Sequence, residues 1–131
     1  RFARNCYYIG SHIGMAFQIK DDILDYTQTT DGFGKPVLED VRQGIYSAPL
    51  IYAMHKKNAP FKELLEKKDQ LTKKETQIIQ QFVIHSGGLD EAKRLAEKYT
   101  DKALKRIDQL PDSSEKEMIR NLTLSLLDRT I

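Results

Sequence analysis

The chain has 131 residues, a length that suits one domain. Hydrophobic residues make up 40% of it and charged residues 31%, which is typical of a globular protein, and a net charge of +2 is too small to indicate nucleic-acid binding by bulk charge. The single cysteine excludes an internal disulfide and fits a reducing compartment, so we expect a cytoplasmic protein.

The first predicted helix covers about residues 2–26. Apolar side chains recur along it at steps of three, four and seven residues, namely Phe2, Cys6, Ile9, Ile13, Phe17 and Leu24. Between Arg4 and Lys20 the only ionisable base is His12, and a helix that is apolar nearly all round is usually buried. We therefore expect Cys6 to be a small core residue. The opening, RFARNCYYIG, resembles helix interior without a cap, so we expect a piece of a longer chain.

A polar stretch follows, TQTTDGFGKPVLED, in which Gly32, Gly34 and Pro36 predict a loop. The next helix is predicted at about 43–57, with Pro49 near its first turn. Its expected inward side chains are Ile45, Ala48, Pro49, Tyr52 and Ala53. The segment APFKELLEKK predicts a further short helix.

The remaining segments also show helical spacing. Thr72 and Glu75 form a possible capping box for a helix that continues to about Ser86, where SGG stops it. Two more helices are predicted at 89–110 and at about 113–129. The last one carries the apolar residues Met118, Ile119, Leu122 and Leu126. Because the two-residue alternation of strands is nearly absent, the sequence predicts an all-α fold.

Three carboxylates stand within five residues at the end of the first helix, in FQIKDDILDY. At ~100° per residue, one stripe of about 100° holds four polar side chains, Gln18, Asp21, Asp22 and Asp25. Like charges three and four residues apart repel, and they face the negative end of the helix dipole, each effect being worth up to ~1 kcal/mol. Lys20 points elsewhere on the wheel. A divalent cation would relieve the repulsion, and Mg²⁺ prefers one or two carboxylates with water and substrate phosphates.

A solvated acidic helix end is the alternative to a metal site, and the nearly uncharged segment before it weighs against that alternative. An EF-hand that starts at Asp25 would need a glutamate where Pro36 stands. GFGKP lacks the Walker spacing, and the histidines lack zinc spacing. Lys35 lies between Gly34 and Pro36, where an ammonium group would neutralise the side of a diphosphate that faces away from the metal. Taken alone, Lys35 fits a solvated loop lysine better, and the diphosphate contact is favoured only by the combined pattern.

Together these segments resemble the trans-type polyprenyl diphosphate synthases. GMAFQIKDDILDY resembles the second aspartate-rich region of that family, FQxxDDxxD. GKPVLEDVRQGIYSAPLIYAM resembles its GKxxxxD pattern followed by the helix start G-x-x-[ST]-x-P, and HSGGLDEAKRLAEKYTDKAL resembles its later GG-x-x-x-A helix. The resemblance covers essentially the whole chain and is closest to bacterial medium- and long-chain synthases of the hexaprenyl and heptaprenyl type.

The resemblance implies an all-helical bundle or barrel of the isoprenoid synthase type, of which residues 1–131 would be the C-terminal portion of a single domain. It implies a prenyltransferase that condenses an allylic prenyl diphosphate with isopentenyl diphosphate by Mg²⁺-assisted ionisation. Gln18 and Lys35 would contact the allylic diphosphate, and Asp40 would order the loop of this substrate site. The implied Mg²⁺ ligands, catalytic together with Lys35, are Asp21, Asp22 and Asp25.

The chain departs from the family pattern in two ways. Ile45 stands where many members carry lysine, which removes one diphosphate contact. Only one DDxxD motif is present, so the first aspartate-rich motif and the isopentenyl diphosphate site would belong to a missing N-terminal half. We therefore expect residues 1–131 alone to be inactive. The resemblance also implies that the parent chain forms a homodimer or a heteromer with a second subunit. The alternative is a non-catalytic helical subunit of a heteromeric synthase.

Overall fold

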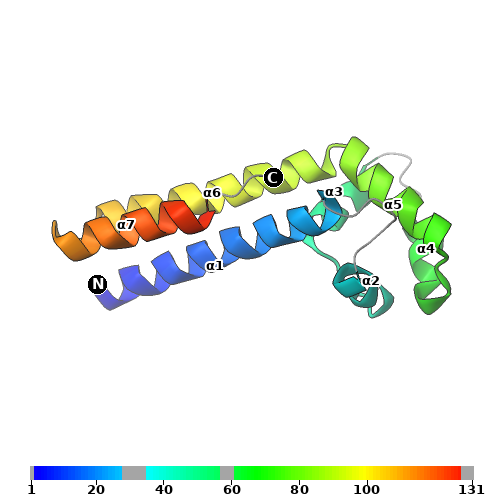
Figure 1. Ribbon diagram of the computed structural model, residues 1–131, viewed down its shortest axis with the longest axis horizontal. Coiled ribbons are helices and arrows are strands. Elements are labelled where there is room, and N and C mark those ends of the chain that lie inside the picture. The colour runs from blue at the N-terminus through cyan, green and yellow to red at the C-terminus, as the bar shows by residue number, and fades with distance from the viewer. Residues whose placement is uncertain (1, 28–34, 57–60, 128–131) are drawn as a thin grey trace. The chain divides into compact units, whose positions relative to one another are not determined.

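The computed structural model describes residues 2–27, 35–56 and 61–127, and every regular element within these ranges is a helix (Figure 1). The predicted all-α fold is therefore confirmed. The helices are α1 (Phe2–Thr27), α2 (Lys35–Arg42), α3 (Ala48–Met54), α4 (Phe61–Glu66), the 3-10 helix η1 (Lys68–Gln70), α5 (Lys73–His85), α6 (Gly88–Asp108) and α7 (Ser114–Leu127). None of these described helices is both long and apolar enough to cross a membrane.

The described residues form two compact units. Unit 1 takes its residues from 1–20 and 93–131, and unit 2 takes its residues from 21–92. The long helices α1 and α6 contribute to both units, whereas α7 belongs to unit 1 and the helices from α2 to α5 belong to unit 2. The aspartate-rich end of α1 therefore belongs to unit 2, together with the segments that follow it.

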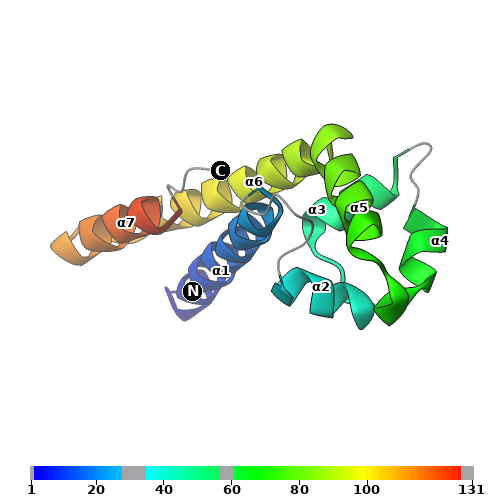
Figure 2. The ribbon, with the colours of Figure 1, turned by 45° about the vertical axis from the view of Figure 1, so that its right-hand side comes forward.

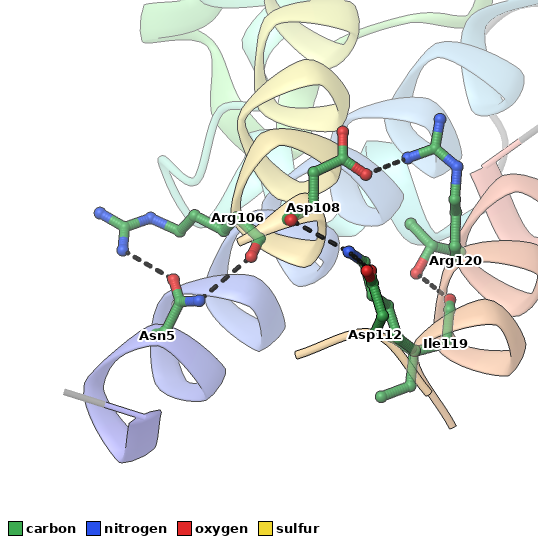
Figure 3. A network of polar contacts seen from close by, with 8 residues as sticks. Asn5, Arg106, Asp108, Asp112, Ile119 and Arg120 are labelled. Carbon is green, nitrogen blue, oxygen red and sulfur yellow. Dashed lines mark hydrogen bonds and ion pairs between the residues drawn. The ribbon is translucent and has the colours of Figure 1, made fainter. Parts of the chain in front are cut away.

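In unit 1, α7 folds back along α6 (Figures 1 and 2), and α1 packs on α6 through one face. Ile9 is buried against Ile107 and Leu110. Asn5 and Arg106 add a reciprocal contact: Asn5 Nδ2 donates to the Arg106 carbonyl oxygen at 3.1 Å, and Arg106 Nη1 donates to Asn5 Oδ1 at 3.2 Å (Figure 3). The regular apolar spacing of α1 therefore forms a buried contact on the one face of the helix that packs on α6.

Rings and cations line the same α1–α6 contact farther along. The His12 ring lies 6.0 Å from the Tyr8 ring and 5.9 Å from the Tyr99 ring, centroid to centroid. The Arg106 guanidinium lies 4.3 Å from the centroid of Tyr8, and Lys102 Nζ lies 5.3 Å from the centroid of Tyr99. We call these five residues the aromatic–cation cluster.

The prediction that α1 is buried nearly all round is wrong for the described chain. Cys6 is exposed, and Phe2 and Tyr7 expose 64% and 70% of their surface. Apolar residues of α7 are exposed as well, namely Met118, Ile119, Leu122 and Leu126. The physical reason is that unit 1 supplies only α6 and α7 as neighbours for α1, which leaves its other faces without cover from the described residues.

The predicted loop is wrong over residues 35–40, which form most of α2, while residues 28–34 lie outside the described residues. Proline breaks a helix interior but is tolerated in the first turn, which is where Pro36 lies. A Schellman cap then ends α2: Gly44 has a φ of +80°, its N–H donates to the Val41 carbonyl oxygen, and the Ile45 N–H donates to the Asp40 carbonyl oxygen at 2.8 Å.

The helix predicted at 43–57 is shorter than expected, because the chain is in this turn until α3 begins at Ala48. The helix ends at Met54. Pro49 lies in its first turn, as predicted, and is buried together with Ala53. Ile45, predicted to face inward, exposes 55% of its surface because it belongs to the turn between α2 and α3.

In unit 2, α3 packs on α5, and α2 packs on η1 (Figure 2). The predicted capping box of α5 is confirmed, because Thr72 Oγ1 accepts from the Glu75 N–H at 3.2 Å and the Glu75 carboxylate accepts from the Thr72 N–H at 3.0 Å. The Phe61 and Phe82 rings meet edge to face at 5.2 Å. The buried face of α5 also contacts the end of α1, because Gln80 Nε2 donates to the Tyr26 carbonyl oxygen.

Candidate metal and diphosphate site

Three aspartates occupy the last turns of α1. Asp21, Asp22 and Asp25 are all partly buried, and the helix continues without a break to Thr27. Gln18 lies one turn earlier on the same helix and is exposed. The helical spacing on which the polar stripe was predicted is therefore confirmed, whereas the roles of these side chains in binding stay predictions.

The electrostatics of this helix end are those of crowded negative charge. Partial burial raises the pKa of the Asp25 carboxyl above its ordinary value, and the charges of Asp21 and Asp40 raise it further. Asp40 comes from the last turn of α2, where its side chain is exposed. The fold thus brings an acid from a second helix within electrostatic range of the motif, close to the end of α1. The family resemblance had implied for Asp40 only the ordering of a loop.

Among the described residues, no three histidine, cysteine, aspartate or glutamate side chains are grouped closely enough to hold a metal ion by themselves. This is compatible with Mg²⁺, which is usually held by one or two carboxylates and completes its shell with water and phosphate oxygens. The chemistry of the donors fits as well, because a hard cation beside Asp25 would reverse the like-charge effect of Asp21 and Asp40. Asp21, Asp22 and Asp25 are the residues that would hold it.

A buried tyrosine follows the last aspartate and connects α1 to two other segments. Tyr26 has no exposed surface. The Ser47 hydroxyl donates to the Tyr26 hydroxyl oxygen at 3.4 Å, and Gln80 Nε2 donates to the Tyr26 carbonyl oxygen at 2.9 Å. Burial raises the pKa of the Tyr26 hydroxyl far above its ordinary value, with the charges of Asp22 and Asp25 adding to the shift, so this side chain stays protonated.

Ser47 and Gln80 were not predicted as functional residues. Ser47 is the N-cap residue of α3, yet its side chain makes no cap hydrogen bond, because the hydroxyl is turned to Tyr26. Gln80 shares the buried face of α5 with Thr76, Ile79 and Val83, at steps of three and four residues. A glutamine on such a face must find a buried partner, and this was the available signal.

Lys35 begins α2, and its side chain lies outside the described residues, as does Gly34. Its predicted contact with a diphosphate therefore stays a prediction. The ammonium group of Lys20, the local base, donates to the Leu127 carbonyl oxygen within unit 1. The sequence-based expectation that Lys20 does not neutralise the acid stripe is consistent with this contact.

The fold is the all-α fold of the isoprenoid synthases. It is similar to the crystal structure of geranylgeranyl pyrophosphate synthase from Lactobacillus brevis, with a TM-score of 0.85 and 43% sequence identity over 92% of this chain and 38% of that one. It is also similar to a polyprenyl synthase from Caulobacter crescentus complexed with calcium and isoprenyl diphosphate, with a TM-score of 0.75 and 29% identity over 96% of this chain and 39% of that one.

Residues 1–83 match the family model of polyprenyl synthetase. The chain belongs to this family. A curated relative, solanesyl-diphosphate synthase 1 of Oryza sativa subsp. japonica, which is named mitochondrial, is 33% identical over 129 residues, a span that covers 95% of this chain. The chain spans 29% of the length of that relative, and thus well under half of it.

Proposed function

We propose that the chain is part of a prenyltransferase that condenses an allylic prenyl diphosphate with isopentenyl diphosphate and releases a longer trans-polyprenyl diphosphate. The observation that carries this proposal is the group of carboxylates at the end of α1, where the charges of Asp21 and Asp40 both raise the pKa of Asp25. The chain that carries this group belongs to the polyprenyl synthetase family. The Caulobacter relative was crystallised with calcium and isoprenyl diphosphate, which supports a divalent cation and a prenyl diphosphate as the ligands.

In this proposal the acidic residues of the chain bind the cation, and an amide and an ammonium group bind the diphosphate. Mg²⁺, when bound, neutralises the charge that builds up on the diphosphate as it leaves. The carboxylates of Asp21, Asp22 and Asp25 hold the cation at the end of α1. Gln18 donates an amide hydrogen to the allylic diphosphate, and Lys35 places an ammonium group on it. Asp40, on the same helix α2 as Lys35, orders the segment that carries this lysine.

The printed sequence contains one aspartate-rich motif, and the chain spans 38% of the Lactobacillus structure, so we propose that residues 1–131 by themselves do not turn over. The parent chain is proposed to act as a homodimer or with a second subunit, in the cytoplasm.

The experiment uses the parent chain that contains these residues. It is incubated with farnesyl diphosphate, labelled isopentenyl diphosphate and Mg²⁺, and the labelled lipids are separated by length. We expect a defined elongated product that disappears on chelation and in Asp21→Ala. Asp101→Ala is the matched control, because Asp101 is an exposed aspartate on α6. It should keep full activity.

Two results would contradict the proposal. Product formation that is unchanged in Asp21→Ala would remove the aspartates from the reaction. A folded parent chain that is inactive until a partner protein is added, and whose Asp21→Ala variant supports the same activity in that mixture, would show a non-catalytic subunit.

A further inference from the structure

A residue of another helix forms a hydrogen bond with the end of α1, at Tyr26, the residue after the last aspartate. Gln80 Nε2 donates to the Tyr26 carbonyl oxygen at 2.9 Å across 54 positions of sequence. The glutamine is 1% exposed, and the tyrosine is fully buried. Both residues belong to unit 2, as do the three aspartates. The contact therefore joins the middle of α5 directly to the turn that carries Asp22 and Asp25.

This contact matters because of where it falls on the helix. The last four carbonyl groups of an α-helix have no N–H partner within the helix, and α1 ends at Thr27. The Tyr26 carbonyl is one of these four. Thr27 Oγ1 satisfies another of them, the Leu24 carbonyl, by a local contact at 3.3 Å. The Gln80 contact ties this turn to a different helix, whereas the Thr27 contact stays within α1.

The same contact also has the right electrostatic sign. The carbonyl end of a helix is the negative end of its dipole, and carboxylates are unfavourable there. An amide N–H that points at this end partly offsets the negative potential, without bringing a cation that would compete with a metal. Ser47 reinforces the position from the start of α3, since its hydroxyl donates to the Tyr26 hydroxyl oxygen at 3.4 Å, which is long for a hydrogen bond. We expect Gln80 to have the larger effect.

We propose that Gln80, assisted by Ser47, is a positioning residue for the metal site: by holding Tyr26, it sets the direction in which the last turn of α1 presents Asp22 and Asp25 to a divalent cation. The inference rests on the proposed function, because it takes these aspartates to be metal ligands. Partners that orient metal ligands through hydrogen bonds commonly contribute about tenfold or more to metal affinity.

The test measures Mn²⁺ binding by the 131-residue chain in the presence of inorganic diphosphate, with free Mn²⁺ followed by electron paramagnetic resonance. Gln80→Met keeps the length of the side chain and removes the amide. Thr76→Val is the matched control, since Thr76 is also buried on α5 and its hydroxyl donates to the Lys73 carbonyl oxygen of the same helix. We expect Mn²⁺ affinity to fall on the order of tenfold in Gln80→Met and to stay within about twofold in Thr76→Val.

Tyr26→Phe separates the two contacts. It removes the hydroxyl that faces Ser47 and leaves the carbonyl group that faces Gln80. We expect it to weaken Mn²⁺ binding less than Gln80→Met does, and we expect Ser47→Ala to add nothing to it. Hydrogen exchange of the amides in residues 22–27, measured without metal, should speed up in Gln80→Met and not in Thr76→Val.

The outcomes separate the two proposals. If Asp25→Asn weakens Mn²⁺ binding while Gln80→Met behaves like Thr76→Val, the positioning role is overturned and the metal site stands. If Asp21→Ala and Asp25→Asn both bind Mn²⁺ as the unaltered chain does, the metal site itself is wrong. Equal exchange of residues 22–27 in the Gln80 and Thr76 variants would overturn the positioning role whatever the metal does.

Discussion

Gly88 lies so close to α3 that a β-carbon at this position would come within 2.8 Å of the Pro49 carbonyl oxygen. It would also come within 3.0 Å of Ala53. Position 88 begins α6, and both partners belong to the same unit. The start of α6 therefore packs directly on the backbone of α3, and only glycine leaves the room for this contact.

Gly88→Ala is expected to destabilise the chain by about 1–3 kcal/mol, the usual cost of forcing extra atoms into a packed contact. The neighbour that must move is largely backbone, so a side-chain rotation does not solve the clash. Urea unfolding followed by circular dichroism measures the change. A free energy of unfolding equal to that of the unaltered chain would show that α3 and α6 separate freely at this point.

Gly10→Ala should change stability in the opposite direction. Gly10 lies within α1, and a β-carbon built on it meets nothing within 4 Å. Alanine in a helix interior is more stable than glycine by about 0.5–1 kcal/mol, because glycine loses more backbone entropy on folding. The same unfolding experiment on the 131-residue chain should therefore show a gain. A loss would mean that another surface covers Gly10 in solution.

His12 should make the stability of unit 1 depend on pH. Partial burial lowers the pKa of His12, and the charges of Arg106 and Lys102 lower it further. The unfolded chain then binds a proton at a higher pH than the folded chain does. Stability is therefore complete above the ordinary histidine pKa of about 6.5 and declines as pH falls below it.

The measurement is the midpoint of thermal unfolding between pH 7.5 and 5. His12→Phe keeps a ring between Tyr8 and Tyr99 and cannot bind a proton, so we expect its midpoint to decline less over this range than that of the unaltered chain. His85→Gln, at an exposed position of α5, serves as the control and should keep the original slope. Identical slopes for all three proteins would refute the role of the aromatic–cation cluster.

Thr72→Ala should lower the stability of unit 2 by about 1 kcal/mol, the usual contribution of a helix N-cap. Two hydrogen bonds of the capping box would be affected. The Thr72 hydroxyl that accepts from the Glu75 N–H is lost, and the bond from the Thr72 N–H to the Glu75 carboxylate loses its reciprocal partner. Lys67 also forms an ion pair with Glu75, which lowers the pKa of the Glu75 carboxyl. Thr72→Ser retains the hydroxyl group and should restore most of the loss in chemical unfolding.

Local features were predicted well, and features that depend on distant partners were not. The capping box of Thr72 and Glu75 needs residues only three positions apart, so its pattern could be recognised in the sequence. The helical stripe of aspartates is equally local. The contact of Gln80 with Tyr26 joins residues 54 positions apart, and nothing in either neighbourhood indicates the other.

The errors have physical causes of the same kind. Pro36 was taken as a helix breaker, although the first turn of α2 accommodates it. Cys6 was expected in a core because α1 is apolar, but burial depends on what surrounds a helix as well as on its composition. The described neighbours of α1 in unit 1 leave Cys6 exposed.

The cap that ends α2 places few constraints on the side chain at position 45. The cap uses only the backbone N–H of Ile45, while the side chain is exposed. Any residue except proline supplies that N–H. The resemblance places lysine here in many family members, so in the proposed diphosphate site an exchange between lysine and isoleucine would alter the charge offered to the substrate without altering the turn. At the proposed site, ligand affinity could then be adjusted at position 45 separately from folding.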